Sequence, residues 1–325
     1  MLAVKTKEIF RLLILVLLFL FSQSCEEEDR SLELLAQEAP DLDSLRPASP
    51  FTGRIAFQSD LDGDNEIYVL TDKGTEKLTD NSWDDVYPRW SPDRKRIAFS
   101  ANREGNFDIF IMEADGHNAL RITDSPQDEG DPAWFADGRT VLYSEEIKRG
   151  FSRRSHLWMI DLATKEKKRV IPDFSGTHFL ADCSPLAPLI AFTGKKLMGW
   201  DVFLFDSKRQ AYRDLVQGGK SCRPRFSPDG KTIAYVSSQA DGKGDIWTMA
   251  WDGSGQQRVT ELNETHDYFP SWSPDGTRIV FCSNPKSGYA DQGDWAIYVV
   301  EVSKKTVVPL FDSPGRDVFP DWAEK

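Results

Sequence analysis

An apolar triplet recurs six times along this chain, and its spacing constrains the fold more than any other feature. The triplet reads Ile-Ala-Phe or a close variant of it. The six copies begin at Ile55, Ile97, Val141, Ile190, Ile233 and Ile279. A period of about 45 residues is typical of a four-stranded propeller blade. The sequence therefore predicts a ring of repeated β-sheets.

Each triplet is flanked by the same neighbours. Before it stands a strand that ends in a tight turn, as in Pro270–Gly276 (PSWSPDG). Proline and glycine at these places fit a hairpin turn. After it comes an apolar run of four, as in Ile109–Met112 (IFIM). A continuous apolar run is typical of a strand that is buried on both faces.

The count of strands gives the architecture. Six triplets are matched by six inner strands with a Pro-x-aromatic core or its remnant, but the chain starts with a triplet and ends with an inner strand at 319–322. The last strand must therefore complete the first blade, which leaves no orphan sheet edge. We expect an all-β, six-bladed propeller over residues 53–325.

These residues resemble the TolB-type propeller repeat, whose signature is an aromatic-Ser-Pro-Asp-Gly turn, an apolar triplet and then Asp-Ile-Tyr. The resemblance covers about residues 53–322. The fourth blade departs most, because Cys183 replaces the aromatic residue and Ser184–Pro188 replaces the turn. The α/β domain that precedes the propeller in the family's namesake has no counterpart here. The resemblance implies a non-catalytic binding module of the cell envelope, with a protein or peptide partner at one propeller face.

The first 24 residues read as a signal peptide. Lys5, Lys7 and Arg11 precede an apolar run of ten, Leu12–Phe21, which is too short to span a membrane but fits a signal sequence. The following Ser24-Cys25 pair resembles a bacterial lipoprotein cleavage site, which implies a lipid anchor on Cys25. Ordinary signal cleavage is the alternative.

Residues 25–52 are acidic and contain three prolines, so we expect a disordered tether. The run Glu26–Asp29 also resembles the tag that carries some Gram-negative lipoproteins to the cell surface, although it equally fits a solvated charge run. The expected location is the outer membrane, facing either the periplasm or the outside.

The charge and the cysteines limit the partners. A formal net charge of −12 argues against nucleic acid, because that interaction needs a basic surface. We expect a monomer. Beyond Cys25 there are Cys183, Cys222 and Cys282; the first two fall near adjacent inner strands and could pair, although free thiols are the simpler reading.

Catalytic signatures are missing from the sequence. There is no GxSxG, HExxH, phosphate-loop or dinucleotide motif, so we expect binding rather than catalysis and no cofactor. The segment Asp60–Glu66 (DLDGDNE) looks like a calcium loop. Because the same slot holds related segments in other blades, we interpret it as a repeated hairpin turn.

A set of polar residues stands three positions before the proline of the inner strands. Loops at this point surround one mouth of a propeller channel. We therefore predict an electronegative ring that receives a cation or a basic peptide segment, with Asx-turn capping as the alternative. The predicted ligand-binding residues are Asp85, Glu129, His178, Asp267 and Asp317, with Ser221 at the remaining position and Asp84, Asp128 and His266 one residue earlier.

His178 and His266 raise one enzymatic alternative. With a nearby carboxylate they could bind a transition metal, and some carbohydrate lyases on similar propellers use histidine and a metal at this mouth. The runner-up function is therefore a metal-assisted polysaccharide lyase or hydrolase of the oligogalacturonate-lyase type. Separately, Trp83, Trp200, Trp251 and Trp295 could form an exposed aromatic cluster, or could fill the gaps between blades.

Overall fold

The computed structural model describes residues 51–149, 152–172, 174–195, 199–262, 264–285 and 293–324. The predicted signal peptide, Cys25 and nearly all of the tether lie outside these residues. Within them, no helix is long and apolar enough to span a membrane.

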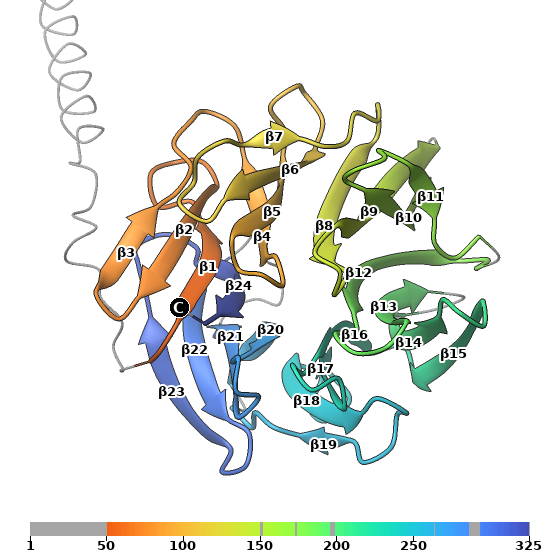
Figure 1. The fold of residues 1–325 in the computed structure, drawn as a ribbon. Coiled ribbons are helices and arrows are strands. Elements are labelled where there is room, and N and C mark those ends of the chain that lie inside the picture. The colour runs from red at the N-terminus through yellow and green to blue at the C-terminus, as the bar shows by residue number, and fades with distance from the viewer. Residues whose placement is uncertain are drawn as a thin grey trace, which may run out of the picture. The chain divides into compact units, whose positions relative to one another are not determined.

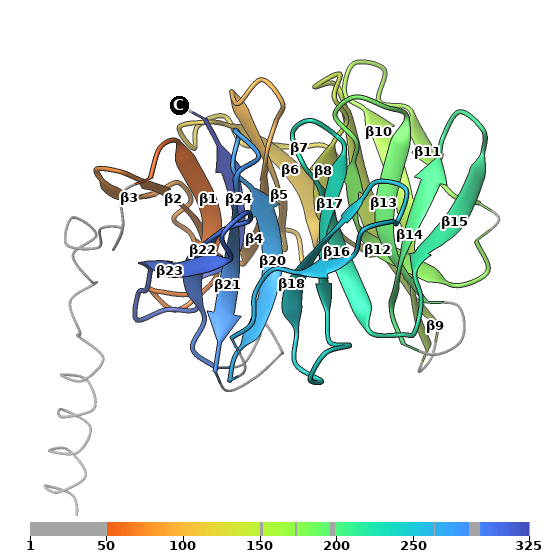
Figure 2. The same cartoon turned by 90° about the horizontal axis from the view of Figure 1, so that it is seen from below.

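Six four-stranded antiparallel sheets form a ring, as predicted. Figure 1 shows one strand of each sheet next to the central axis, and Figure 2 shows the sheets from the side. The inner strands, for the first to the sixth blade, are β24 (Val318–Ala323), β4 (Asp85–Trp90), β8 (Asp128–Trp134), β12 (Thr177–Cys183), β16 (Ser221–Phe226) and β20 (His266–Trp272).

The second strand of each blade carries the apolar triplet, and its residues are almost entirely buried. Both faces are covered because each sheet packs between two neighbours. In blade order these strands are β1 (Arg54–Ser59), β5 (Arg96–Ala101), β9 (Thr140–Arg149), β13 (Leu189–Lys195), β17 (Thr232–Ser237) and β21 (Arg278–Asn284).

The third strands are also largely buried. The outer strands are more exposed, and four of them contain only two to four residues. The third strands are β2 (Glu66–Thr71), β6 (Asp108–Glu113), β10 (Ser152–Asp161), β14 (Asp201–Asp206), β18 (Asp245–Ala250) and β22 (Ala296–Glu301). The outer strands are β3 (Gly74–Lys77), β7 (Leu120–Arg121), β11 (Lys167–Arg169), β15 (Ala211–Val216), β19 (Gln257–Arg258) and β23 (Thr306–Phe311).

The hydrophobic core lies between blades. One cluster joins Ile109 and Ile111 of the second blade to Trp134, Val141 and Tyr143 of the third, and comparable clusters span other junctions. Burying such side chains contributes about 1.5–3 kcal/mol each, so each blade depends on its neighbours for stability.

The C-terminal strand closes the ring. Strand β24 pairs antiparallel with β1, and Trp322 lies opposite Ile55. The indole Nε1 of Trp322 donates to the carbonyl oxygen of Thr52 at 2.9 Å, and its ring packs edge-on against Phe51. The predicted closure is confirmed.

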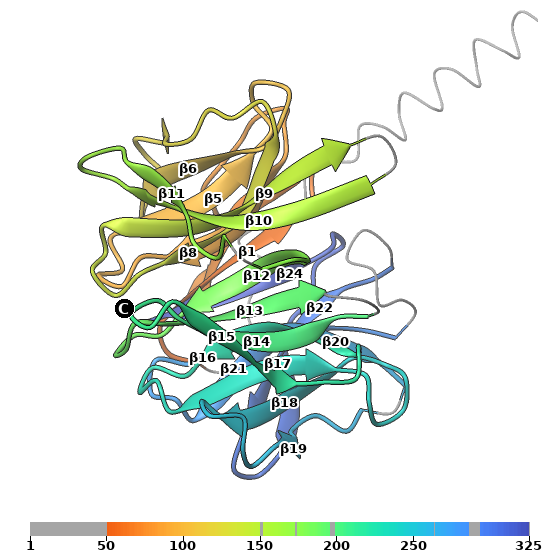
Figure 3. The same ribbon diagram turned by 90° about the vertical axis from the view of Figure 1, so that its right-hand side faces the viewer.

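The third blade contains the longest strands among the described residues. Strands β9 and β10 contain 10 residues each, and Figure 3 shows that they extend past the neighbouring strands β12 and β13. This hairpin stands beside one mouth of the central channel.

The central channel as candidate binding site

Every inner strand contains a β-bulge at its proline position. In β4, for example, Val86 pairs with Ser100 but Arg89 pairs with Ala98, so Tyr87 and Pro88 bulge out of the ladder. Proline lacks an N–H and cannot donate to a ladder, which is why bulges accept it. The recurring Pro-x-aromatic sequence therefore marks a bulge in each blade.

The residue just before each proline position has a left-handed backbone. Such a conformation is uncommon outside glycine and costs roughly 1 kcal/mol or more per residue. We call the six side chains at these positions the bulge ring. It comprises Tyr87 (φ 58°), Asp131 (φ 52°), Leu180 (φ 48°), Arg223 (φ 57°), Phe269 (φ 59°) and Phe319 (φ 56°).

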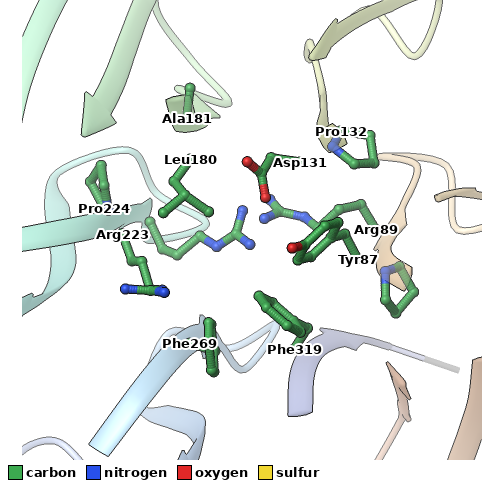
Figure 4. A pocket seen from close by; sticks show the side chains of 12 residues that line it. Tyr87, Arg89, Asp131, Pro132, Leu180, Ala181, Arg223, Pro224, Phe269 and Phe319 are labelled. Carbon is green, nitrogen blue, oxygen red and sulfur yellow. The ribbon is translucent and has the colours of Figure 1, made fainter. Parts of the chain in front are cut away.

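All six side chains of the bulge ring line one cavity in the channel. Figure 4 shows Tyr87, Asp131, Leu180 and Phe319 converging on its centre from different inner strands. Because each blade contributes one residue to the bulge ring, each blade can supply a different chemical group to the cavity.

One side of this cavity is aromatic. The ring centroids of Phe269 and Phe319 are 3.9 Å apart, and those of Tyr87 and Phe319 are 4.4 Å apart. The guanidinium carbon of Arg223 lies 4.6 Å from the Phe269 ring centroid and 5.0 Å from that of Tyr268. Cation–π contacts of this kind hold the Arg223 head group against the aromatic wall.

Asp131 adds a carboxyl group to the same cavity. Its Oδ2 accepts a hydrogen bond from Ser144 Oγ at 3.2 Å. Burial raises the pKa of Asp131 to about 6, although the hydrogen bond from Ser144 and the positive charge of Arg223 oppose this shift. The cavity thus holds a carboxyl group whose charge changes near neutral pH.

An ion-pair network forms the floor of the cavity. Arg89 Nη2 lies 2.6 Å from Asp182 Oδ1, and Arg89 Nε lies 3.4 Å from Asp321 Oδ1. Arg225 Nη1 is 3.5 Å from Asp182 Oδ1. These residues also line the opposite mouth, next to the Ser-Pro-Asp turns. The network therefore separates the cavity from that mouth.

The other end of the cavity opens into a wide mouth of about 630 Å³. Its walls carry charges of both signs, and the long hairpin of the third blade contributes Glu146 and Arg153. Tyr87, Asp131, Leu180, Arg223 and Phe319 are shared between the mouth and the cavity below it. A ligand at the wide mouth would thus reach the bulge ring directly.

The residues of the predicted electronegative ring are buried. The five residues proposed for it, Asp85, Glu129, His178, Asp267 and Asp317, are at most 2% exposed. Glu129 alone among them borders the mouth, whereas Asp84 and Asp128, one residue before two of these positions, do line it. Ligand binding by these five residues stays a prediction, and their surroundings give them a structural role.

The partners of these carboxyl groups lie inside the blade junctions. Asp85 accepts from Asn81 Nδ2 at 2.7 Å, and Asp267 accepts from Ser283 Oγ at 2.7 Å. Asp317 accepts from the backbone N–H and Oγ of Ser313, both at 2.8 Å. Neighbouring hydroxyl, amide and backbone groups therefore bind these carboxyl groups, which agrees with the capping alternative, although Asp85 Oδ1 and Asp267 Oδ2 are buried without a hydrogen-bond partner among the described residues.

At three junctions, an acidic residue of one blade faces an acidic residue of the next. The pairs are Glu66 with Asp85, Asp108 with Glu129, and Asp245 with Asp267. Burial raises the pKa of Glu66 and of Glu129 to about 7, and that of Asp245 to about 6. Two carboxylates cannot both ionise cheaply in such a place, so these pairs retain protons that exposed carboxyl groups would lose.

The two metal-ligand candidates do not come together. His178 Nδ1 accepts the backbone N–H of Leu157 at 3.0 Å, and its Nε2 lies 3.4 Å from His156 Nδ1. His266 belongs to the sixth blade, where it pairs with Asn284. Among the described residues, no group of three or more His, Cys, Asp or Glu side chains could hold a metal ion.

The calcium-like segment forms part of a hairpin connection. Asp60 Oδ1 accepts from the backbone N–H of Arg316 at 2.7 Å, and Asp62 pairs with Lys77. Its carboxylates are therefore directed at protein cations and N–H groups, as the hairpin interpretation predicts.

The tryptophans outside the inner strands do not form one cluster. Trp295 is fully buried, whereas Trp200 and Trp251 are partly exposed. Trp200 precedes β14 and Trp251 follows β18; because these third strands run in the same direction, the two rings lie at opposite faces of the propeller. The thiols of Cys183, Cys222 and Cys282 are free, so Cys183 and Cys222 do not pair.

A comparison with known families agrees with this architecture. The TolB β-propeller domain matches residues 43–152 and 149–290. The chain belongs to the TolB β-propeller family. The solved TolB structure from Acinetobacter baumannii superposes with a TM-score of 0.69 at 20% identity, over 85% of this chain and 68% of that one.

Relatives of this TolB-like propeller include two kinds of protein. Dipeptidyl-peptidase 5 of Porphyromonas endodontalis is 28% identical over 69% of this chain and 33% of its own length. The Tol-Pal system protein TolB of Francisella tularensis subsp. holarctica is 26% identical over 71% of this chain and 51% of its own length. The chain thus spans a third to a half of these relatives.

The enzymatic alternative has a structural counterpart at the level of fold alone. An oligogalacturonate lyase in complex with manganese superposes with a TM-score of 0.56 at 14% identity, over 80% of this chain and 74% of that one. At this identity the likeness carries over no catalytic residue.

The bulge ring escaped the sequence analysis. Its signal was available, since the six residues immediately before the proline position differ in chemistry between blades, whereas the residues three positions before the proline are mostly acidic. A repeated residue serves the repeated fold, and a varied one at a fixed position points to a site.

Proposed function

We propose that this chain is a non-catalytic binding protein of the cell envelope that holds a protein partner at the wide mouth of its channel. The observation that carries the proposal is the bulge ring, in which six side chains converge on one cavity that is open to the wide mouth. A segment of the partner would enter the cavity, while the mouth contacts the surrounding surface.

The composition of the cavity suits binding. Aromatic residues and arginine are the residue types that dominate the free energy of protein interfaces, and here Tyr87, Phe269, Phe319 and Arg223 meet in one place. Their left-handed backbones fix the side chains in advance, which reduces the entropy lost when a ligand binds.

The envelope location rests on the N-terminal sequence and on the relatives. Signal cleavage before Cys25 would leave a lipid anchor, and the acidic segment 26–52 would serve as a tether to the outer membrane. Related proteins bear the name Tol-Pal system protein TolB, which supports a protein partner in the envelope.

A site-specific photo-crosslinker tests the partner surface. We would place p-benzoylphenylalanine at Phe179, which lines the wide mouth, and at Trp251 on the opposite face as the matched control. Irradiation of whole cells should yield a discrete protein adduct at position 179 and none at 251. Equal labelling at both positions, or no adduct at 179, would refute the proposed binding face.

Fractionation tests the anchor separately. Wild-type protein should sediment with outer membranes, and Cys25→Ala should abolish lipid attachment and release the protein from them. If the variant stayed in the outer membrane as firmly as the wild type, the lipid anchor would be excluded as the cause of attachment.

A further inference from the structure

Two guanidinium groups in the channel cavity have hydrogen-bonding capacity that the protein leaves unused. The Nε of Arg223 and the Nη1 of Arg89 are buried and have no partner among the described residues. Arg223 donates to Cys222 Sγ at 3.1 Å but forms no ion pair with a described carboxylate. Buried donors without partners are costly, so their persistence in one cavity needs a cause.

Both arginines line the same cavity. Arg89 is held from below by Asp182 and Asp321, and Arg223 is stacked on Phe269 and Tyr268. Their head groups are therefore fixed before any ligand arrives. A planar guanidinium with free donors recognises a carboxylate by charge-assisted hydrogen bonds.

Apart from Asp131 and Arg225, the rest of the cavity wall is mostly apolar. Leu180, Phe269 and Phe319 line it together with Tyr87 and three prolines. A small, fully hydrated anion such as phosphate would bury this surface poorly. A ligand that matches both the guanidinium groups and the apolar wall carries an aromatic or branched apolar group next to its carboxylate.

We propose that the cavity binds an apolar group bearing a free carboxylate, namely the C-terminal residue of the partner chain. This inference rests on the proposed function, and it specifies which part of the partner enters the channel. Arg223 and Arg89 receive the carboxylate, and the aromatic wall receives the side chain.

Asp131 shares the cavity and carries the same charge as the expected ligand. Its carboxylate lowers the affinity for an anion by direct repulsion. Removing this charge should therefore increase the affinity for the ligand. Asp131→Asn should bind the carboxylate more tightly than the wild type. A gain in affinity cannot result from misfolding.

The test uses a fluorescein-labelled peptide, Gly-Ser-Gly-Ser-Phe, with either a free or an amidated C-terminus, and measures anisotropy with the full chain. The free acid should bind at least about tenfold more tightly than the amide, as expected for a charge-assisted hydrogen bond. Arg223→Gln should abolish this preference. Arg213→Gln, an exposed arginine stacked on Trp251 at the opposite face, is the matched control and should retain it.

Competition with unlabelled 3-phenylpropanoate distinguishes a small apolar carboxylate from the C-terminus of a protein as the ligand. If it competes as well as the peptide acid, the cavity takes small apolar carboxylates and the peptide terminus is not required. Peptide acid binding that resists this competitor supports the C-terminus of a protein.

Equal affinity for the acid and the amide, a preference that survives Arg223→Gln, or no binding of either peptide would overturn the inference. None of these results depends on the photo-crosslink at position 179, which tests the proposed function by itself. A crosslink at position 179 without a preference for the free acid would support the proposed binding face and overturn the proposed recognition of a C-terminal carboxylate.

Discussion

The guanidinium of Arg89 in the second blade lies 2.6 Å from Asp182 of the fourth blade, so an ion pair joins blades that are not neighbours in the ring. The same guanidinium lies 3.4 Å from Asp321 of the first blade. All three side chains are nearly buried. Arg89 is thus the point at which three blades meet across the axis.

Arg89→Leu should be strongly destabilising. It leaves the buried carboxylate of Asp321 without its cation and that of Asp182 with Arg225 alone, and breaking a buried ion pair costs about 3–5 kcal/mol. Urea unfolding should show this loss in the free energy of unfolding. The control is Arg139→Leu, which removes a half-exposed pair with Asp161 and should cost less than about 1 kcal/mol. Similar losses for both variants would contradict a central role for Arg89.

Removing residues 317–325 should unfold the propeller as a whole. The deletion takes away β24, the strand that pairs with β1, and exposes the core around Trp322. Circular dichroism should show loss of the cooperative melting transition. Deleting Glu324 and Lys325 alone removes no strand and should leave the transition unchanged. A 317–325 deletion that melted like the intact protein would disprove closure by this strand.

Folding stability should fall as the pH rises from about 4.5 to about 7. Burial raises the pKa of Glu66 and Glu129 to about 7, above their values in an unfolded chain, so the folded state binds more protons in this range. The stabilisation is complete below the unfolded pKa and is lost as the pH passes the folded pKa. The free energy of unfolding, measured by urea titration between pH 4.5 and 8, tests this expectation.

Glu129→Gln is the variant that identifies the group responsible. It removes one titrating carboxyl and should reduce the slope of stability against pH between 4.5 and 7. Glu76→Gln, a change at an exposed residue of β3, should keep the wild-type slope. An unchanged slope in Glu129→Gln would mean that this junction does not hold the extra proton.

His178 should act in the opposite direction. Burial, with the nearby His156 and Arg169, lowers the pKa of His178 to about 3. Its contribution to stability is present above its unfolded pKa of about 6.5 and is lost as the pH falls toward 3. His178→Gln should therefore lose less stability than the wild type on going from pH 6.5 to pH 4. If both proteins lost the same amount, His178 would not be the titrating group.

Most of the fold was predictable from the sequence repeat. Triplet spacing, turn signatures and the surplus strand at 319–322 predicted six blades and their closure. The six four-stranded sheets confirm the number of blades, and the pairing of Ile55 with Trp322 confirms the closure. These features are readable because each blade repeats the same short-range chemistry and each junction buries the same apolar residues.

The site was predictable only in part. The sequence pointed to the correct loops, and Asp84 and Asp128 do line the wide mouth. Asp85 and Asp267, one residue farther along their strands, instead turn into the blade junctions, because successive residues of a strand face opposite sides. Tyr87 and Phe319 were missed since a residue before proline normally stays extended, and only the bulge turns it to the axis.

The bulge places the side chains that line the cavity outside the strand pairing that holds each blade together. Ladder pairing resumes on both sides of Tyr87, and in each of the other inner strands a shift of register accompanies the bulge residue. A substitution at one of these six positions would then alter the lining without disturbing sheet register. A propeller built this way can acquire a new specificity through a few point substitutions, one blade at a time.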